Sequence, residues 1–162
     1  MKLLSFYSDE DYPIYQRIIN VMGILKEEGV FCGQVRRLAF SCPTFLITKD
    51  NKDIGFVYFA EENNGKVLSV DMGIIQEYRN RGIGYTLLEN LVTQLTLKVS
   101  SYVMAEVKPD NLASLKMVNK LGGVYIGDNY YLLQPERKQN LLKDIANNKI
   151  NLGNNYTKVL RA

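Results

Sequence analysis

The stretch YRNRGIGYTLLENL, Tyr78 to Leu91, passes within a few residues from arginine and glycine to a leucine-rich pattern. Apolar residues recur at helical spacing from Ile83 to Leu95, so the sequence predicts a helix that begins near Ile83. The first amide groups of a helix have no partners within it and carry partial positive charge, which suits an anion. The stretch therefore predicts a phosphate site at the start of this helix.

Glycine at the helix start removes side chains that would keep a phosphate away from the backbone. We expect a pyrophosphate on these amides, with two arginines adding charge around it. The expected contact residues are Arg79, Asn80, Arg81, Gly82, Ile83, Gly84 and Tyr85. The alternative is structural: Gly82 supplies only a left-handed turn, and Gly84 only a close contact between helix and strand.

Two common phosphate motifs do not fit this stretch. A P-loop needs a lysine followed by serine or threonine after its last glycine, and Gly84 is followed by Tyr85 and Thr86. The dinucleotide fingerprint needs a third glycine, where this chain has Leu87. Another class of phosphate ligand is therefore expected.

Composition limits the chemistry further. The 162 residues fit one domain over 1–162, with a basic, asparagine-rich tail at 136–162 that we expect to pack on it. No apolar run approaches the length of a membrane span, and the N-terminus lacks a signal-peptide pattern, so a cytoplasmic protein is expected. With no histidine and only Cys32 and Cys42, the chain offers no zinc site of four nitrogen and sulfur ligands and no nucleophile paired with histidine. No metal is implied.

The coarse secondary structure predicts an α/β fold with an antiparallel front half. One or two helices over Asp11–Gly29 come first, and three strands follow at Thr44–Asp50, Asp53–Glu62 and Lys66–Ile75. The short links NK and NNG between them predict antiparallel hairpins. The three strands therefore form a meander.

The second half alternates strands and helices. A strand at Ser101–Lys108 follows the helix after Gly82, and the next helix starts after Pro109–Asn111 and ends at Gly122 and Gly123. The order strand, helix, strand, helix, strand from Lys66 to Leu133 predicts right-handed crossovers and a locally parallel sheet. A helix with Pro135 in its first turn and a last strand in NYTKVLRA complete the expectation.

The segment GIIQEYRNRGIGYTLLENLV resembles the acyl-CoA-binding signature of the GNAT superfamily of N-acetyltransferases, commonly V-x-P-E-Y-R-G-x-G-x-G. Ile74 stands at its valine and Gln76 at its proline, while Arg79, Gly82 and Gly84 match its core R-x-x-G-x-G. A second segment, EVKPDNLASLKMVNKLGGVYIG, resembles the family's strand–helix–strand unit. Its matching residues are Asn111, Ser114, Leu121 and Gly122.

The resemblance implies a GNAT-like mixed sheet and acetyl-CoA as cosubstrate. The strand ending at Ile74 would carry a bulge, consistent with Gly73, and would splay from the Ser101–Lys108 strand to admit the pantetheine arm. The backbone residues implied to contact the arm are Met72, Gly73, Ile74 and Ile75. Asn111 and Ser114 would touch the coenzyme, or Asn111 would be only a helix cap with Ser114 in the first turn.

The resemblance also implies transfer of an acetyl group to a primary amine by direct attack in a ternary complex, with the oxyanion held by backbone N–H near Ile74. Glu106, five residues before Asn111, matches the general base of relatives that acetylate ribosomal-protein N-termini, and Asp71 is the second candidate. The alternative for Glu106 is a strand-end acid that pairs with Lys108 or with water.

One departure from the family pattern concerns the leaving thiol. Where many GNAT enzymes have a tyrosine that protonates it, this chain has Val118, and Gly123 replaces the usual aromatic residue. A thiolate can leave unprotonated at a cost of only about 2 kcal/mol at pH 7. The groups able to supply the proton are Tyr125, Tyr130, Tyr131, Ser114 and water.

Two other classes of function stay open. A module that binds CoA or acyl-CoA without turnover is consistent with Val118, and a nucleic-acid-associated protein would depend on the basic tail. The acidic Ser8–Asp11 would draw a cationic amine or would only begin a helix. The acceptor, a small molecule or a protein amine, and a homodimer are left open.

Overall fold

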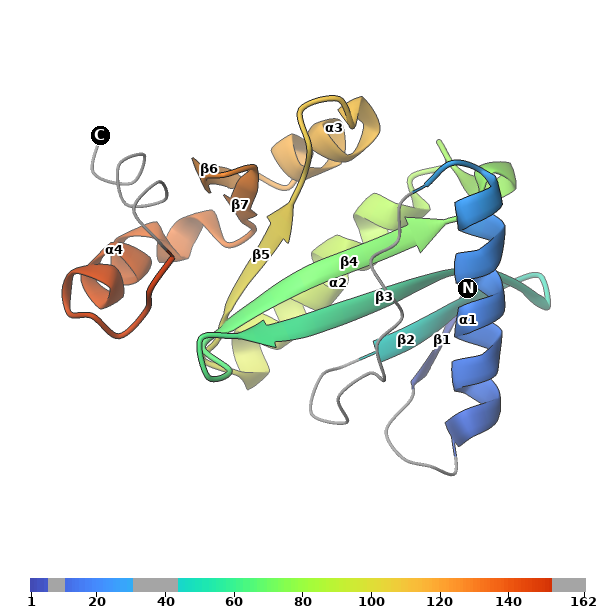
Figure 1. Cartoon of the computed structure of the whole chain (residues 1–162), viewed down its shortest axis with the longest axis horizontal. Helices are drawn as coiled ribbons and strands as arrows, with labels where there is room; N and C mark the ends of the chain where they lie inside the picture. The colour runs from blue at the N-terminus through green and yellow to red at the C-terminus, as the bar shows by residue number, and fades with distance from the viewer. Residues whose placement is uncertain (6–10, 31–43, 153–162) are drawn as a thin grey trace. The chain divides into compact units, whose positions relative to one another are not determined.

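The computed structural model describes residues 1–5, 11–30 and 44–152, and it has a mixed α/β architecture with a seven-stranded mixed sheet and flanking helices (Figure 1). Its residues cluster into two compact units. The first comprises Met1–Ala60 and Asp71–Gly84, and the second Glu61–Val70 and Tyr85–Ala162. The units are described separately below.

The first unit contains the strands that precede the glycine-rich stretch. Its elements are β1 (Lys2–Ser5), α1 (Tyr12–Glu27), β2 (Thr44–Lys49), most of β3 (Lys52–Glu62), the second half of β4 (Val67–Ile74) and the short 3-10 helix η2 (Gln76–Tyr78). β1 pairs antiparallel with β2, and β2 pairs antiparallel with β3. The expectation that helices come first was therefore wrong, because a short strand precedes α1. Four residues are too few for a periodic signal, and only pairing with β2 defines β1.

Left-handed residues form the hairpin turns of the meander. Asp50 and Asn51 have φ values of 53° and 59°, and Asn63, Asn64 and Gly65 have φ values of 50°, 55° and 80°. Lys66 N donates to Asn63 O, so Asn64 and Gly65 are the central residues of the second turn. Two consecutive positive φ values characterise the type I′ turn, which matches the twist of an antiparallel hairpin, and Asn and Asp tolerate this conformation. The predicted strands are confirmed, but the first turn is Asp50–Asn51 rather than the dipeptide NK.

The β3–β4 hairpin keeps one register along its length. Lys66 N donates to Asn63 O over 3.1 Å at the turn, and Ile75 N donates to Ile54 O over 2.8 Å at the open end. The two strands advance by the same number of residues between these bonds, so the pairing contains no net inserted residue. The bulge at Gly73 stays a prediction, and a β-carbon on Gly55 would overlap Gly73 O, so the two strands approach closely there.

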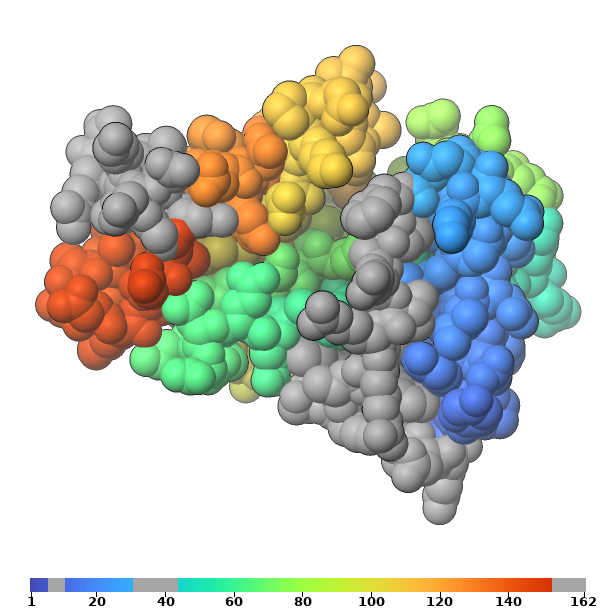
Figure 2. Space-filling view, in the orientation of Figure 1, coloured from blue at the N-terminus to red at the C-terminus, as the bar shows by residue number. Residues whose placement is uncertain are grey.

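Close packing of α1 requires a glycine at position 73. A β-carbon on Gly73 would lie 2.5 Å from Leu25 Cδ1 and 3.0 Å from Phe56 Cε1. Figure 1 shows α1 crossing the strands of this unit on one face. The buried residues of α1 are Ile18, Val21 and Leu25. Figure 2 shows α1 in blue at the surface. Tyr12 and Ile24 of this helix are exposed.

The second unit contains the crossover that follows the glycine-rich stretch. Its elements are the first half of β4, α2 (Ile83–Lys98) from Tyr85 onward, β5 (Tyr102–Glu106), α3 (Leu112–Lys120), β6 (Val124–Gly127), β7 (Tyr130–Leu132), the 3-10 helix η3 (Pro135–Arg137) and α4 (Lys138–Ala146). β4 pairs in parallel with β5 from Val67↔Tyr102 to Val70↔Ala105. The predicted strand, helix and parallel strand are confirmed here.

The parallel arrangement does not continue beyond β5. β7 pairs antiparallel with β5, and β6 pairs antiparallel with β7, so the strand after α3 is separated from β5 by its own hairpin partner. Asp128 and Asn129, with φ values of 48° and 66°, form the turn between β6 and β7. This Asp-Asn pair has the same composition as the turn at Asp50–Asn51, and it is the signal that would have predicted the hairpin.

In the second unit, the last described residues pack against the strands in a buried apolar cluster. Leu141 of α4 and Ile150 pack in a buried cluster with side chains of four strands: Val67, Tyr102, Met104, Ile126 and Leu132. Pro135 begins η3, and α4 starts at Lys138, so the predicted helix is divided into two. The predicted last strand NYTKVLRA lies outside the described residues.

Candidate functional site

The loop before α2 adopts a left-handed backbone at two of its residues. Asn80 has φ of 62° and Gly82 has φ of 75°. A β-carbon on Gly82 would meet no heavy atom within 4 Å, so the space around it is open, whereas its φ would strain any other residue. Left-handed turns of this kind direct successive backbone amides into one concavity, which is how backbone N–H groups bind anions. The loop and the helix start are thus suited to a phosphate.

Arg79 is held by protein groups. Its Nε donates to Ile74 O and its Nη2 to Glu28 Oε1, each over 2.7 Å, and its side chain is 34% exposed. Arg79 is therefore not the free charge around the phosphates that its place in the motif predicts, because Glu28 compensates it. No local pattern predicts this pair, because the two residues lie on different elements and far apart in the chain.

Arg81 differs from Arg79 in its surroundings. Its guanidinium carbon lies 5.0 Å from the centroid of the Tyr78 ring, and the residue is exposed. Tyr78 itself is buried, so it provides a fixed aromatic surface on which the guanidinium rests. None of the salt bridges among the described residues includes Arg81, so it can meet an anion in solvent without first breaking one.

The backbone direction at the end of β4 follows from the hydrogen bonds of Ile75. Ile75 donates its N–H to Ile54 O and accepts Tyr78 N over 3.0 Å, so both of its backbone groups have partners. Backbone groups of successive residues in an antiparallel ladder point to opposite sides. The N–H groups of Ile74 and Met72 therefore point away from β3, where a pantetheine arm could meet them.

Tyr85 in the first turn of α2 has a cation and a carboxylate beside it. Lys120 Nζ lies 4.1 Å from the centroid of its ring. The hydrogen bond with Glu89, together with partial burial and the charge of Glu89, raises the pKa of Tyr85. Lys120 was not among the predicted site residues, because it lies at the end of α3 and only the fold brings it to Tyr85.

Asn111 is the N-cap of α3. Its Oδ1 accepts a hydrogen bond of 3.2 Å from Ser114 N, and the residue is exposed. The helix cap predicted at Asn111 is thus confirmed. A capping side chain uses one oxygen lone pair for the helix, and contact with a coenzyme stays a prediction for both residues.

The two candidate bases lie in different units. Glu106 ends β5 in the second unit, where it is exposed and opposite Tyr130 in the β5–β7 pairing. Burial raises the pKa of Glu62, and the charge of Glu106 contributes to this shift. Asp71 lies on the part of β4 that belongs to the first unit, and it is half-buried.

Val118 and Gly123, the two departures from the family pattern, pack against each other. Val118 is buried, and a β-carbon on Gly123 would lie 2.6 Å from Val118 Cγ1. A larger residue at 123 would therefore collide with Val118, so the two departures from the family pattern accompany each other. Tyr125 is 44% exposed, and its ring lies 5.3 Å from that of Tyr131.

The start of the basic tail is committed to the fold. Arg137 donates to Ser101 O and Ser100 O, each over 2.8 Å, and its guanidinium lies 4.1 Å from the centroid of the Tyr102 ring. This arginine is therefore tied to the protein surface and does not project as free charge. Cys32 and Cys42, Ser8–Glu10, and the tail residues Lys158 and Arg161 lie outside the described residues.

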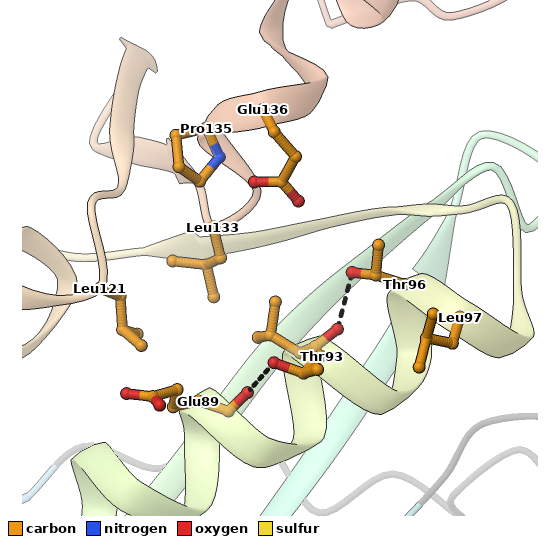
Figure 3. A pocket seen from close by; sticks show the side chains of 9 residues that line it. Glu89, Thr93, Thr96, Leu97, Leu121, Leu133, Pro135 and Glu136 are labelled. Atoms are coloured by element: carbon orange, nitrogen blue, oxygen red, sulfur yellow. Dashed lines mark hydrogen bonds between the residues drawn. The ribbon is translucent and has the colours of Figure 1, made fainter.

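A pocket of about 270 Å³ opens in the second unit (Figure 3). Glu89, Thr93, Thr96 and Leu97 line it from α2, and Leu133, Pro135 and Glu136 face them from the segment after β7. None of the predicted site residues lines this pocket. The chemistry predicted from the sequence therefore does not belong to it.

Two further findings concern metals and membranes. Within residues 1–5, 11–30 and 44–152, no group of three or more acidic or cysteine side chains is arranged to hold a metal ion. Over the same ranges, none of the helices combines the length and apolarity needed to cross a membrane.

Comparison with known proteins places these features in one family. The model of the acetyltransferase (GNAT) family matches residues 7–123, and the chain belongs to this family. Comparison with curated protein sequences finds no significant match.

Solved structures support the fold. A GNAT acetyltransferase from Streptococcus pneumoniae has a TM-score of 0.64 and 19% identity, covering 78% of this chain and 86% of its own. A ribosomal-protein-alanine N-acetyltransferase from Brucella melitensis has a TM-score of 0.57 and 16% identity, covering 76% and 85%. A Salmonella typhimurium protein solved with its cofactor acetyl-CoA has a TM-score of 0.54 and 13% identity, covering 76% and 80%.

Proposed function

We propose that this protein is an N-acetyltransferase that transfers the acetyl group of acetyl-CoA to a primary amine by direct attack in a ternary complex. The observation that carries the proposal is the start of α2, where left-handed Asn80 and Gly82 precede a helix with open space around the glycine. This arrangement fits a pyrophosphate on the backbone amides from Arg81 to Tyr85. Membership of the GNAT family agrees with an acyl-CoA ligand.

The proposed cofactor contacts come from groups that point away from β3 or into solvent. Arg81 supplies charge to the phosphates, and the N–H groups of Met72 and Ile74 meet the pantetheine arm. Ile75 is omitted from this set, since its N–H and C=O are already bonded to Ile54 and Tyr78. Asn111 keeps its capping role and meets the coenzyme only through its remaining polar groups.

Acetyl-CoA supplies an acetyl group activated as a thioester. Glu106 takes a proton from the ammonium form of the acceptor, since only the neutral amine has a free electron pair for attack. The N–H of Ile74 stabilises negative charge that develops on the carbonyl oxygen. A new C–N bond forms, the C–S bond then breaks, and the attacking nitrogen loses its second proton to water. The thiolate takes a proton from Tyr125, which regains one from water, or from water directly.

A non-catalytic CoA-binding module is the second candidate. Val118, in the position where many relatives have the proton-donating tyrosine, is buried and carries no donor. Under this alternative the protein binds CoA and acetyl-CoA with similar affinity and releases no thiol with any amine. A cytoplasmic location and a homodimer stay predictions under both candidates.

Thermal unfolding with acetyl-CoA tests cofactor binding. We expect acetyl-CoA at 100 times its Kd to stabilise the natural chain by about 2.7 kcal/mol. Gly82→Glu should abolish this stabilisation, because its carboxylate repels the pyrophosphate. Gly65→Glu is the matched control: Gly65 also has positive φ, 80° against 75° at Gly82, and open space around its β-carbon position. The control should lose similar stability but keep the response to acetyl-CoA.

Thiol release separates the two candidate functions. The natural chain, acetyl-CoA and a thiol reagent are combined with polyamines, aminoglycosides, amino acids and peptides with free N-termini. Release of CoA that depends on one amine class supports the transferase and identifies the acceptor. Cofactor binding without release in any class favours the binding module, and absence of binding by the natural chain contradicts both.

A further inference from the structure

We propose that Glu28 is a positioning residue for acetyl-CoA, acting through Arg79 to hold the backbone between β4 and α2 in its binding conformation. The inference rests on the proposed function and assigns a role to a residue outside the matched motifs. It also changes the role of Arg79, from a phosphate ligand to a brace of the loop.

The Glu28 carboxylate meets the connection at two places. It accepts the backbone N–H of Gln76, at 3.0 Å to Oε1 and 3.2 Å to Oε2, and it pairs with Arg79 Nη2 at 2.7 Å. Its side chain is only 19% exposed. Charge-assisted hydrogen bonds of this kind, partly shielded from water, are stronger than exposed salt bridges.

Arg79 extends the contact back to the strand. Its Nε donates to Ile74 O over 2.7 Å, so one guanidinium joins the end of β4 to the carboxylate at the end of α1. The peptide between Ile74 and Ile75 is thereby fixed on both sides, since Ile75 N–H is bonded to Ile54 O. The contacts hold the residues that lead into the Asn80–Gly84 turn.

Arg79 and Arg81 differ in whether a neighbouring carboxylate compensates their charge. Glu28 compensates the charge of Arg79, so a phosphate that recruited Arg79 would have to break this salt bridge. Arg81 is exposed and rests on the Tyr78 ring. We therefore assign phosphate charge to Arg81 and loop geometry to the Glu28–Arg79 pair.

Calorimetric titration with acetyl-CoA tests the role of Glu28. Glu28→Gln keeps an acceptor for Gln76 N–H but removes the charge that holds Arg79, and we expect its Kd to rise roughly tenfold. Arg17→Gln is the matched control, because Arg17 forms a bidentate salt bridge with Asp53 in the same unit. Its Kd should change less than about twofold even where its stability falls equally.

Hydrogen exchange provides a readout that a general loss of stability would not produce. In free Glu28→Gln protein, the amides of Asn80–Gly84 should exchange faster than in the natural chain, while the amides of β2 exchange as before. In Arg17→Gln, the exchange of Asn80–Gly84 should be unchanged. Equal acceleration of these amides in both variants would overturn the positioning role.

Arg79→Lys distinguishes a brace from a phosphate ligand. Lysine keeps the positive charge but cannot bond Ile74 O and Glu28 in the same fork geometry. Under the proposal its Kd rises as much as that of Glu28→Gln, and the double variant is no worse than either single variant. A Kd near that of the natural chain for Arg79→Lys, or an unchanged or lower Kd for Glu28→Gln, would overturn the inference. If the natural chain does not bind acetyl-CoA, the proposed function fails. If the natural chain binds it but the variants behave otherwise than expected, only the role of Glu28 fails.

Discussion

The side chain of Leu25 on α1 occupies the space that a β-carbon on Gly73 would need, with only 2.5 Å between that position and Leu25 Cδ1. The strand and the helix are therefore in direct contact at this point, and the sequence must place glycine there. The same contact lies close to the end of β4, the strand whose backbone we assign to the pantetheine arm.

Gly73→Ala should destabilise the protein by about 1–3 kcal/mol, because the added methyl group overpacks the contact with Leu25. Gly23→Ala on α1 is the control, since a β-carbon there meets no atom within 4 Å. That control should stabilise the protein by about 0.5–1 kcal/mol through the helix propensity of alanine. Urea unfolding measures both. Equal effects of the two substitutions would contradict tight packing at Gly73.

Tyr102 should make stability sensitive to alkaline pH. Burial, and then the hydrogen bond of 2.7 Å to Asp144, raises the pKa of Tyr102 to about 12. An unfolded tyrosine has a pKa of about 10, so this stabilisation is complete below pH 10 and is lost as pH rises toward 12. Tyr102→Phe should cost about 1 kcal/mol at neutral pH, and the difference from the natural chain should shrink above pH 10. A difference that stays constant to pH 12 would contradict the shift.

Gln134 should be sensitive to loss of its amide. It is fully buried, accepts Val103 N over 2.9 Å and donates to Thr96 Oγ1 over 2.7 Å. Gln134→Leu leaves the buried Val103 N–H without its acceptor, so we expect a loss of about 1–3 kcal/mol in unfolding free energy. Thr93→Val removes an exposed hydroxyl from α2, the helix that carries Thr96, and should change the unfolding free energy by less than about 0.5 kcal/mol. A loss at Gln134 no larger than that of the control would show that this amide does not stabilise the fold.

Glu106 should control the chemical step if it is the general base. Glu106→Gln should lower kcat by about 10² to 10⁴-fold while the Kd of acetyl-CoA stays unchanged. Asp71→Asn serves as the comparison, because Asp71 is the second candidate. The assay uses the acceptor identified by thiol release. A large loss with Asp71→Asn and none with Glu106→Gln would transfer the role to Asp71.

Tyr125 is the candidate proton donor to the leaving thiolate. Tyr125→Phe keeps the ring that packs 5.3 Å from Tyr131 and removes only the hydroxyl. Because a thiolate leaves unprotonated at a cost of about 2 kcal/mol, kcat should fall by no more than about 30-fold. A kcat equal to that of the natural chain would assign the proton to water.

The sequence predicted elements where a local signal was strong. Alternating apolar residues predicted the strands from Thr44 to Ile74, and the link NNG marked the second hairpin, whereas the first turn is Asp50–Asn51 and not the predicted NK. The cap at Asn111 was also readable, since an asparagine before an apolar helical pattern is a typical N-cap. The hairpin of β6 and β7 was missed although Asp128–Asn129 has the same composition as the first turn.

The sequence by itself determined the family, and it predicts a phosphate site at the start of α2, because both depend on residues close together in the chain, around Arg79 to Gly84. Only the tertiary structure decided that Arg79 is paired with Glu28, that Gly73 accommodates Leu25, and that β7 rather than β6 lies beside β5. Each of these depends on contacts between distant segments. Charge compensation and close packing are properties of neighbours in space, and spacing along the chain does not encode them.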